Sequence, residues 1–463
     1  MSKNLKILCL TLLCLILCAT CACKQEKPLT WEIDDDGALI ISGNGEIPDY
    51  EWEDDGEKAP WLEYQDEIEA IIIESGITRI GNHAFFDCES LTSVTIPNSV
   101  TTIGDGAFSF CAELPSIVIP NSVTSIGDAV FHTCESLTSI VIPDGVTSIG
   151  GWAFQDCISL ASVTLPKSLT EIGNYAFKNC TSLTSIAIPK GVTDIGDGAF
   201  THCENLTSIT LPNSLTSIGP DVFIGCLSLP SITIPKNVTT IGNRAFADCE
   251  SLTAITLPNG VTTIGDLAFG YCTALPSITL PNSLTSIGVK AFDSCTSLTS
   301  IVIPDGVTEI GNFAFYKCNS LYTATLPKEI TGIGAGIFAY CSILKVVTIP
   351  NSVTSIGDFA FYGCAMNTLE IPEGVKSIGR AAFFTSKLFV VTIPSSVTSI
   401  GDEAFGWSLM LSSITNLNPV PVAINPNVFE LVATANATLR VPNASVSAYK
   451  NADVWRWFNV EGI

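Results

Sequence analysis

Three histidines, His83, His132 and His202, are the side chains of this sequence best suited to act as general bases near neutral pH. They occupy three different positions of a repeated pattern and lie two or more repeats apart, and no column of Ser, Cys or Asp converges on them. A nucleophile and its base must lie within hydrogen-bond reach of each other. Gly43-Asn44-Gly45 also lacks the lysine and the strand–helix frame of a phosphate-binding loop. The sequence therefore predicts no catalytic residue, and we expect a protein that is not an enzyme.

Eighteen cysteines are the other reactive groups. Five lie in or beside the first 22 residues, and thirteen, from Cys88 to Cys364, share one position of the repeat. There is no Cys-x-x-Cys pair outside the first 23 residues and no cluster of histidines, so we expect no zinc site. A single column of thirteen cannot pair without a remainder. We therefore expect reduced, buried thiols that act as small hydrophobic side chains.

Carboxylates cluster at residues 34–36 and 51–57, and clustered carboxylates suit calcium. Their spacing fits no known calcium loop, so the pattern favours a solvated acidic surface. The sequence thus predicts neither a metal nor a cofactor.

The repeated pattern is an Ile-Gly pair that occurs fifteen times, with a spacing of 23 residues up to Gly357 and 22 residues for the last two steps. Each copy has a Phe four residues after its Gly, and thirteen copies have a Cys seven residues after it. Self-similarity at such a period is the signature of a solenoid, in which stacked repeats bury one continuous core. The glycines are Gly81, Gly104, Gly127, Gly150, Gly173, Gly196, Gly219, Gly242, Gly265, Gly288, Gly311, Gly334, Gly357, Gly379 and Gly401.

Three elements are expected within one repeat, taken here as residues 103–125. Ala107, Phe108 and Cys111 are spaced like one face of a short helix, with Asp105 as its N-cap. Residues 116–119 then alternate as in a strand, which Pro120 ends, and residues 123–126 suggest a second extended piece. The predicted fold is a repeat solenoid with one parallel strand, a short second extended piece and a short helix per 22–23-residue turn, capped at both ends.

The motif Leu-x-x-Ile-x-Ile-Pro with Ile-Gly-x-x-Ala-Phe-x-x-Cys resembles the leucine-rich repeats of the BspA-like family, a group of bacterial surface proteins. The resemblance covers nearly all of the chain after its first 22 residues. It implies a leucine-rich-repeat solenoid and, for function, adhesion through binding of host proteins, including matrix proteins.

Residues 1–22 have a positive start at Lys3 and Lys6, an apolar run and a small-residue end, which predicts a secretory signal peptide. Cys23 follows and resembles the lipidated residue of bacterial lipoproteins. We expect lipidation at Cys23 and a lipid-anchored, surface-exposed protein of the bacterial cell envelope. Processing at Cys21 is an alternative, and so is plain cleavage near Ala22, which would release a secreted protein.

Three further regions follow. Residues 23–75 form a lipidated N-terminus and an acidic, β-rich cap, with a hairpin over residues 29–42 and the aromatic residues Trp52, Trp61 and Tyr64. Its Trp-x-Ile and Pro-Trp pattern resembles the N-terminal cap of the family. Residues 76–416 are the solenoid, with irregularities expected at the two 22-residue steps. Residues 417–463 are a degenerate repeat and a C-terminal cap.

The formal charge is −24, and removal of residues 1–22 leaves −26, from 45 acidic and 19 basic residues. A charge of this sign disfavours nucleic acid and electrostatic docking on an acidic membrane face. We expect a monomer that contacts a membrane only through its lipid anchor.

Two outward columns are candidate binding surfaces. The strand positions form a hydroxyl face, with Ser208, Thr210, Ser231, Thr233, Ser277 and Thr279 as its candidate residues. Generic strand propensity on a solvated surface explains these hydroxyls equally well. The positions two, five and six residues after Gly carry large aromatic residues, which concentrate beyond residue 310 as Phe313, Tyr316, Tyr340, Phe359, Tyr362, Phe384 and Trp407. A structural role, in which these rings only pack on neighbouring repeats, competes with binding.

The sequence favours a surface protein that binds an extracellular protein or glycan without catalysis. Two alternatives stay open: a structural cell-surface spacer without a discrete ligand, and a substrate-capture subunit of an enzyme system.

Overall fold

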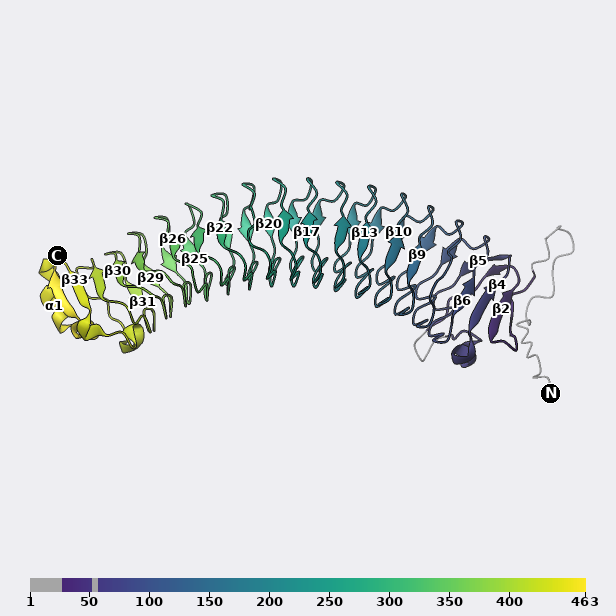
Figure 1. Cartoon of the computed structure of the whole chain (residues 1–463), viewed down its shortest axis with the longest axis horizontal. Coiled ribbons are helices and arrows are strands. Elements are labelled where there is room, and N and C mark those ends of the chain that lie inside the picture. Colours follow the sequence, from purple (N-terminus) through teal and green to yellow (C-terminus); the bar gives the residue numbers. More distant parts are fainter. Residues whose placement is uncertain (1–26, 52–56) are drawn as a thin grey trace, which may run out of the picture. The chain divides into compact units, whose positions relative to one another are not determined.

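The computed structural model describes residues 27–51 and 57–463. They form a parallel-strand solenoid that divides into two units: an amino-terminal unit of residues up to 215 with 221–229, and a carboxy-terminal unit of residues 216–220 with 230–463. Two strand series run through each unit, and strands of successive repeats lie side by side (Figure 1). The predicted signal peptide, Cys21, Cys23 and Trp52 lie outside the described residues.

In most repeats the main strand series lies eleven to fifteen residues after Gly, where Ile and Val point inward between exposed Ser and Thr. Equivalent residues pair in parallel, for example Ile140 with Val163. In the amino-terminal unit its strands are β1 (Thr30–Ile33), β2 (Ala38–Ser42), β4 (Ala70–Ile73), β6 (Ser93–Thr95), β9 (Ser139–Val141), β11 (Ser162–Thr164), β13 (Ser185–Ala187) and β15 (Ser208–Thr210). In the carboxy-terminal unit they are β17 (Ser231–Thr233), β19 (Ala254–Thr256), β22 (Ser300–Val302), β24 (Thr323–Thr325), β26 (Val346–Thr348), β28 (Thr368–Glu370), β30 (Val390–Ile393), β32 (Ser413–Asn416), β33 (Thr438–Val441) and β34 (Asn459–Gly462).

The second series is the predicted extended piece before each Gly, and it also pairs in parallel, as in Ile149 with Ile172. In the amino-terminal unit its strands are β3 (Gly45–Glu46), β5 (Ile77–Ile80), β7 (Thr102–Ile103), β8 (Ser125–Ile126), β10 (Ser148–Ile149), β12 (Glu171–Ile172) and β14 (Asp194–Ile195). In the carboxy-terminal unit they are β16 (Ser217–Ile218), β18 (Thr240–Ile241), β20 (Thr263–Ile264), β21 (Ser286–Ile287), β23 (Glu309–Ile310), β25 (Gly332–Ile333), β27 (Ser355–Ile356), β29 (Ser377–Ile378) and β31 (Ser399–Ile400).

The predicted short helix after each Gly is wrong. Residues two and six positions after Gly have left-handed backbones, as in His83 (φ 53°) and Asp87 (φ 61°), so the segment is two consecutive tight turns. The i, i+1, i+4 apolar spacing fits such turns as well as a helix. The N–H groups of alternate residues donate to the next repeat instead of along a helix, for example His83 N to the carbonyl of Asp105 at 2.8 Å.

Asp105 does not cap a helix either. Its Oδ1 accepts a hydrogen bond from the backbone N–H of Asp128, the equivalent residue of the next repeat, at 2.8 Å. Asp128 in turn accepts from the N–H of Gly151 at 2.7 Å. The column directly after Gly is therefore a ladder of side-chain oxygens that satisfies backbone donors between repeats.

The core contains a stack of Phe rings from the position four residues after Gly. In the amino-terminal unit Trp61 stacks on Phe85 at 5.7 Å between ring centroids, and the series continues to Phe223. In the carboxy-terminal unit the stack runs from Phe246 to Phe429. Pairs such as Phe177 and Phe200, at 5.4 Å and 4°, place equivalent rings nearly parallel because the repeats are copies of one another.

The thirteen cysteines of the repeat lie beside this stack and are buried, as predicted. The thiol of Cys111 donates a hydrogen bond to the carbonyl of Phe85 at 3.3 Å, and Cys134 makes the same contact with Phe108 at 3.2 Å. Ser408 replaces the cysteine near the end of the solenoid and donates to Phe383 in the same way at 3.2 Å. The column therefore needs a small buried donor.

The two ends of the described chain differ from the repeats. At the amino end β1 and β2 form the expected antiparallel hairpin, and the 3-10 helix η1 (Leu62–Glu67), which the sequence did not indicate, places Trp61 on the Phe stack. At the carboxy end Phe429, in η2 (Pro426–Phe429), stacks on Phe405 at 5.6 Å, so the Phe stack continues beyond the last Ile-Gly copy.

The other 3-10 helices at the carboxy end are η3 (Thr434–Asn436), η4 (Asn443–Ser445) and η5 (Trp455–Trp457), and α1 (Val446–Asn451) is the one α-helix of the described residues. No helix among residues 27–51 and 57–463 has the length and apolar character of a membrane span.

The two 22-residue steps are irregular, as expected. At Cys364 and Ser386 the tight turn between the cysteine position and the next strand is missing. Buried Ala365 and Met366 fill the first of these positions.

Candidate functional site

Seven aromatic residues of the carboxy-terminal unit form one row, which we call the aromatic stripe. It consists of Phe313, Tyr316, Tyr340, Phe359, Tyr362, Phe384 and Trp407. All seven lie two, five or six residues after a Gly, within the paired tight turns. There the Phe and Cys positions point into the core, so the intervening positions carry their side chains to the outer side of each repeat.

The rings of the stripe contact each other from repeat to repeat. Centroid distances are 5.5 Å for Tyr316 and Tyr340, 4.9 Å for Tyr340 and Tyr362, and 5.1 Å for Tyr362 and Phe384. Trp407 extends the row at 6.1 Å from Phe384. The stripe is thus continuous over five repeats.

The two pairs that the spacing placed side by side are in contact. Phe313 lies 5.7 Å from Tyr316 and Phe359 lies 6.0 Å from Tyr362, between ring centroids. The prediction of contact is confirmed, although a tight turn and not a helix brings each pair together.

The stripe offers ring edges, hydroxyls and two cations. Tyr340 and Trp407 are 44% and 45% exposed, and the other five rings are half-buried. Lys317 Nζ lies 5.1 Å from the centroid of the Tyr316 ring, and the Arg380 guanidinium lies 5.8 Å from that of Phe359. Burial, with Tyr340 as a hydrogen-bonding neighbour, raises the pKa of Tyr362, so its phenol stays neutral and can donate a hydrogen bond.

The hydroxyl face is exposed, as predicted, but it is less continuous. Ser208 and Thr210 lie on β15 of the amino-terminal unit, and Ser231 and Thr233 lie on β17 of the carboxy-terminal unit. Ser277 and Thr279 are exposed on a segment without assigned strand. No sheet of the described residues joins all six.

The sequence analysis missed a second aromatic row, in the amino-terminal unit. Phe86 lies 5.4 Å from Phe110, which lies 5.1 Å from the His132 ring, and His83 lies 5.9 Å from Phe86. These residues occupy the same three positions after Gly as the aromatic stripe, so comparison of these columns over the first repeats would have found them.

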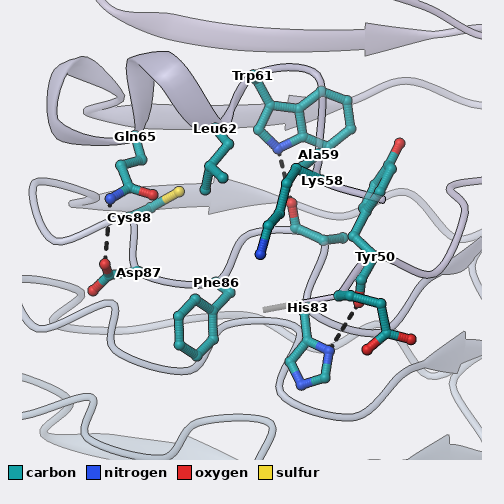
Figure 2. Close-up of a pocket in the computed structure, with 12 residues that line it drawn as sticks. Tyr50, Lys58, Ala59, Trp61, Leu62, Gln65, His83, Phe86, Asp87 and Cys88 are labelled. Carbon is teal, nitrogen blue, oxygen red and sulfur yellow. Dashed lines mark hydrogen bonds between the residues drawn. The ribbon is translucent and has the colours of Figure 1, made fainter. Parts of the chain in front are cut away.

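A cavity of about 270 Å³ opens beside this row, between the cap and the first repeat (Figure 2). Tyr50, Glu51 and Lys58 line it from the cap, and Phe86 and Asp87 line it from the repeat. Hydrogen bonds fix two of its walls: Gln65 Nε2 donates to Asp87 at 3.2 Å, and a ring nitrogen of His83 lies 3.0 Å from the carbonyl oxygen of Tyr50.

Charge is distributed unevenly along the chain. Residues 23–229 contain 30 acidic and seven basic residues, whereas residues 230–463 contain 15 and 12. The aromatic stripe therefore belongs to a nearly neutral region, and the second aromatic row belongs to a strongly acidic one.

The expectation that no Ser or Asp converges on a histidine is wrong for His132. His132 contacts Ser109 and Asp156, at 3.4 and 3.7 Å, and burial lowers its pKa. Burial raises the pKa of the Cys88 thiol to about 12, so it is not a nucleophilic thiolate at neutral pH. Residues 27–51 and 57–463 contain no group of three or more His, Cys, Asp or Glu that could hold a metal ion.

Comparison with known proteins identifies the repeat. The model of the BspA type leucine rich repeat region matches residues 62–181, 124–253, 239–357 and 331–450. A leucine-rich repeat protein from Bacteroides ovatus ATCC 8483, of known crystal structure, is 27% identical; the match covers 94% of this chain and 98% of that chain, with a TM-score of 0.64.

A leucine rich cell surface protein from Faecalibacterium prausnitzii A2-165 is 30% identical, with 84% of this chain and 93% of that chain covered and a TM-score of 0.38. A search of curated proteins found no match. The family model spans well over half of the chain, and this chain belongs to the BspA-type leucine-rich repeat family.

Proposed function

We propose that this protein is a lipid-anchored protein of the bacterial cell surface that binds an extracellular protein without catalysis, and that the aromatic stripe is its main binding surface. The observation that carries the proposal is the continuous contact of seven rings over five repeats, with centroid distances between 4.9 and 6.1 Å. Tyr and Trp desolvate a large area at small entropic cost, and exposed aromatic patches mark interaction sites.

The geometry of the rings favours a protein over a glycan. Sugars stack on open ring faces, but the rings of Tyr362 and Phe384 are tilted by only 15° and cover each other's faces. Beside the rings lie the cations Lys317, 5.1 Å from the Tyr316 ring centroid, and Arg380, 5.8 Å from that of Phe359. Such a surface suits the apolar groups, carbonyls and carboxylates of a polypeptide.

Membership of a surface-protein family supports the location, together with the predicted signal peptide and Cys23. The repeated residues form the backbone hydrogen bonds and the core of the solenoid. This supports a scaffold whose variable outer positions bind a partner and carry out no reaction.

The test replaces Tyr316, Tyr340 and Tyr362 with Ser together and measures binding to the partner captured by the mature protein from a panel of extracellular matrix proteins and glycans. We expect loss of binding with a nearly unchanged melting temperature, because these rings lie outside the core. The matched variant places Lys at Thr210, Thr233 and Thr279 on the hydroxyl face and should keep binding.

Two outcomes contradict the proposal. Binding that survives the triple Tyr change, or that is lost only in the triple Lys variant, makes the hydroxyl face the site. Failure of every member of the panel to bind supports the spacer without a discrete ligand.

A further inference from the structure

The cavity beside the amino-terminal cap has the size of a site for one side chain. Its volume of about 270 Å³ lies just below the range of about 300–1,000 Å³ that is usual for small-molecule sites. Tyr50, Phe86 and Asp87 line it (Figure 2), and Glu51 is a further lining residue. A ring face and a carboxylate together are the groups that stabilise a cation.

One wall of the cavity also contains an unsatisfied acceptor. Gln65 holds Asp87 through its Nε2, while its Oε1 is buried without a hydrogen-bond partner. The hydrogen bond from Gln65 holds the Asp87 carboxylate at the wall of the cavity.

The surroundings of Asp87 favour positive charge. Burial, together with the nearby carboxylates of Glu89 and Asp66, raises the pKa of Asp87, which shows that negative groups crowd this edge. The chain itself extends a lysine, Lys58, into the cavity (Figure 2). The cavity thus already accommodates an ammonium group on a flexible side chain.

The surface continues from the cavity along the second aromatic row. Phe86 leads to Phe110 and then to His132, next to which Asp156 lies 3.7 Å away. Residues that flank an inserted side chain would meet these rings and carboxylates, within the part of the chain that has 30 acidic and seven basic residues.

We propose that this cavity and the second aromatic row form a docking site for a basic polypeptide segment, which inserts one arginine side chain between Phe86, Asp87 and Gln65. A guanidinium presents several N–H donors in a plane, so it can donate to the Asp87 carboxylate while it lies against the ring of Phe86. This site lies in the amino-terminal unit and does not depend on the aromatic stripe.

The test uses the mature chain and labelled hexa-arginine, with hexa-lysine and hexa-glutamate as comparison peptides, followed by fluorescence anisotropy. We expect saturable binding of hexa-arginine, weaker binding of hexa-lysine and none of hexa-glutamate. Binding of hexa-arginine should weaken between about 50 and about 200 mM salt, because the rim of the site is screened.

Matched variants separate the site from net charge. Asp87→Asn should weaken hexa-arginine binding about tenfold, as expected for loss of one partly buried charge contact. Glu171→Gln removes the same charge from the exposed strand β12 of the same unit. This variant should change the affinity for hexa-arginine by less than about twofold. Asn179 occupies the position equivalent to Asp87 with φ 57°, so asparagine fits this backbone.

Two further variants probe the cavity itself. Lys58→Ala should tighten binding at least about threefold, whereas Lys190→Ala, with the same charge change, should leave it within twofold. Phe86→Leu should weaken binding through loss of the ring. The proposal is overturned if Asp87→Asn and Glu171→Gln weaken binding equally, if hexa-arginine does not bind, or if hexa-glutamate binds as well.

Discussion

The ring of Phe313 lies against Gly336, its equivalent two positions after Gly in the next repeat, so closely that a Cβ on Gly336 would overlap the ring. Gly336 also has a left-handed backbone, with φ 59°. The same relationship joins His83 to Gly106 and Tyr175 to Gly198 in the amino-terminal unit. In these three places the ring fills the space that a side chain of the following repeat would need.

Gly336→Ala should destabilise the carboxy-terminal unit by about 1–3 kcal/mol, because it adds both a strained backbone and a clash with Phe313. Displacement of the Phe313 ring should also weaken partner binding through the aromatic stripe. Thermal unfolding followed by circular dichroism measures the first effect. The control is Gly260→Ala, whose Cβ would lie 3.5 Å from the carbonyl oxygen of Val238 and whose backbone is not left-handed. An equal loss in both variants would show that the ring contact is irrelevant.

Phe246→Ala should cost about 3–5 kcal/mol, the usual range for a buried phenylalanine. Phe246 has 0% exposure and stacks on Phe269 at 5.5 Å and 3°. Urea unfolding measures the change, with Phe389→Ala, at 39% exposure, as the control that should cost much less. Similar costs for the two substitutions would argue against a continuous Phe core.

The cysteine column should stay reduced in the native protein and react slowly with thiol reagents. Its thiols are buried, and burial raises the pKa of Cys203 to about 12. Unfolding without reductant should expose about thirteen thiols, in line with their count in the repeat. Mass analysis under non-reducing conditions checks this, and widespread disulfides would refute it.

The same thiols should make the fold sensitive to alkali. Below about pH 9 the thiols are protonated in both states, so their contribution to stability is fully present. Above that pH the unfolded thiols ionise while the folded ones, with raised pKa, do not, and the free energy of unfolding should fall by up to about 1.4 kcal/mol per thiol per pH unit. Melting temperatures between about pH 8 and 10 measure the fall, and replacement of Cys157, Cys180 and Cys203 with Ala should make it shallower. A melting temperature that is constant over this range contradicts the prediction.

Lipidation at Cys23 is tested by metabolic labelling with a palmitate analogue. The wild-type protein should be labelled and Cys23→Ser should not be, because the thiol is the attachment point. Cys21→Ser is the matched control and should keep the label. If the wild type and Cys23→Ser are labelled equally, Cys23 is not the lipidated residue.

The strands and the amino-terminal hairpin could be predicted from the sequence because they depend on alternation and period. The pattern of Ile117 and Ile119 locates the main strand position, and the hairpin of β1 and β2 follows from two runs around an Asp-Gly turn. The helix was predicted wrongly because the spacing of Ala107, Phe108 and Cys111 indicates which side chains are buried and does not determine the backbone conformation. The backbone signal lay in other columns, where Gly106 and Asn179 mark left-handed positions.

The candidate site could be predicted in part. The contact between Phe313 and Tyr316 follows from position in the repeat, so sequence columns are enough. The cavity near Trp61 is different, because η1 and the cap have no equivalent in the repeats and their packing against Phe86 and Asp87 depends on tertiary structure. Only the excess of acidic residues around the cavity could have been predicted from the sequence.

In the tight turns the backbone N–H groups two, four and six residues after Gly donate to carbonyls of the following repeat, as His83, Phe85 and Asp87 do. The N–H of Phe313, for example, donates to the carbonyl of Ala335 in the following repeat. A chain leaves the ribosome amino-terminus first. The backbone N–H donors of the turns in each new repeat therefore have no acceptor until the next repeat is synthesised. The newest repeat is then always the open end of the stack, and assembly can follow the order of synthesis from the amino-terminal cap onward.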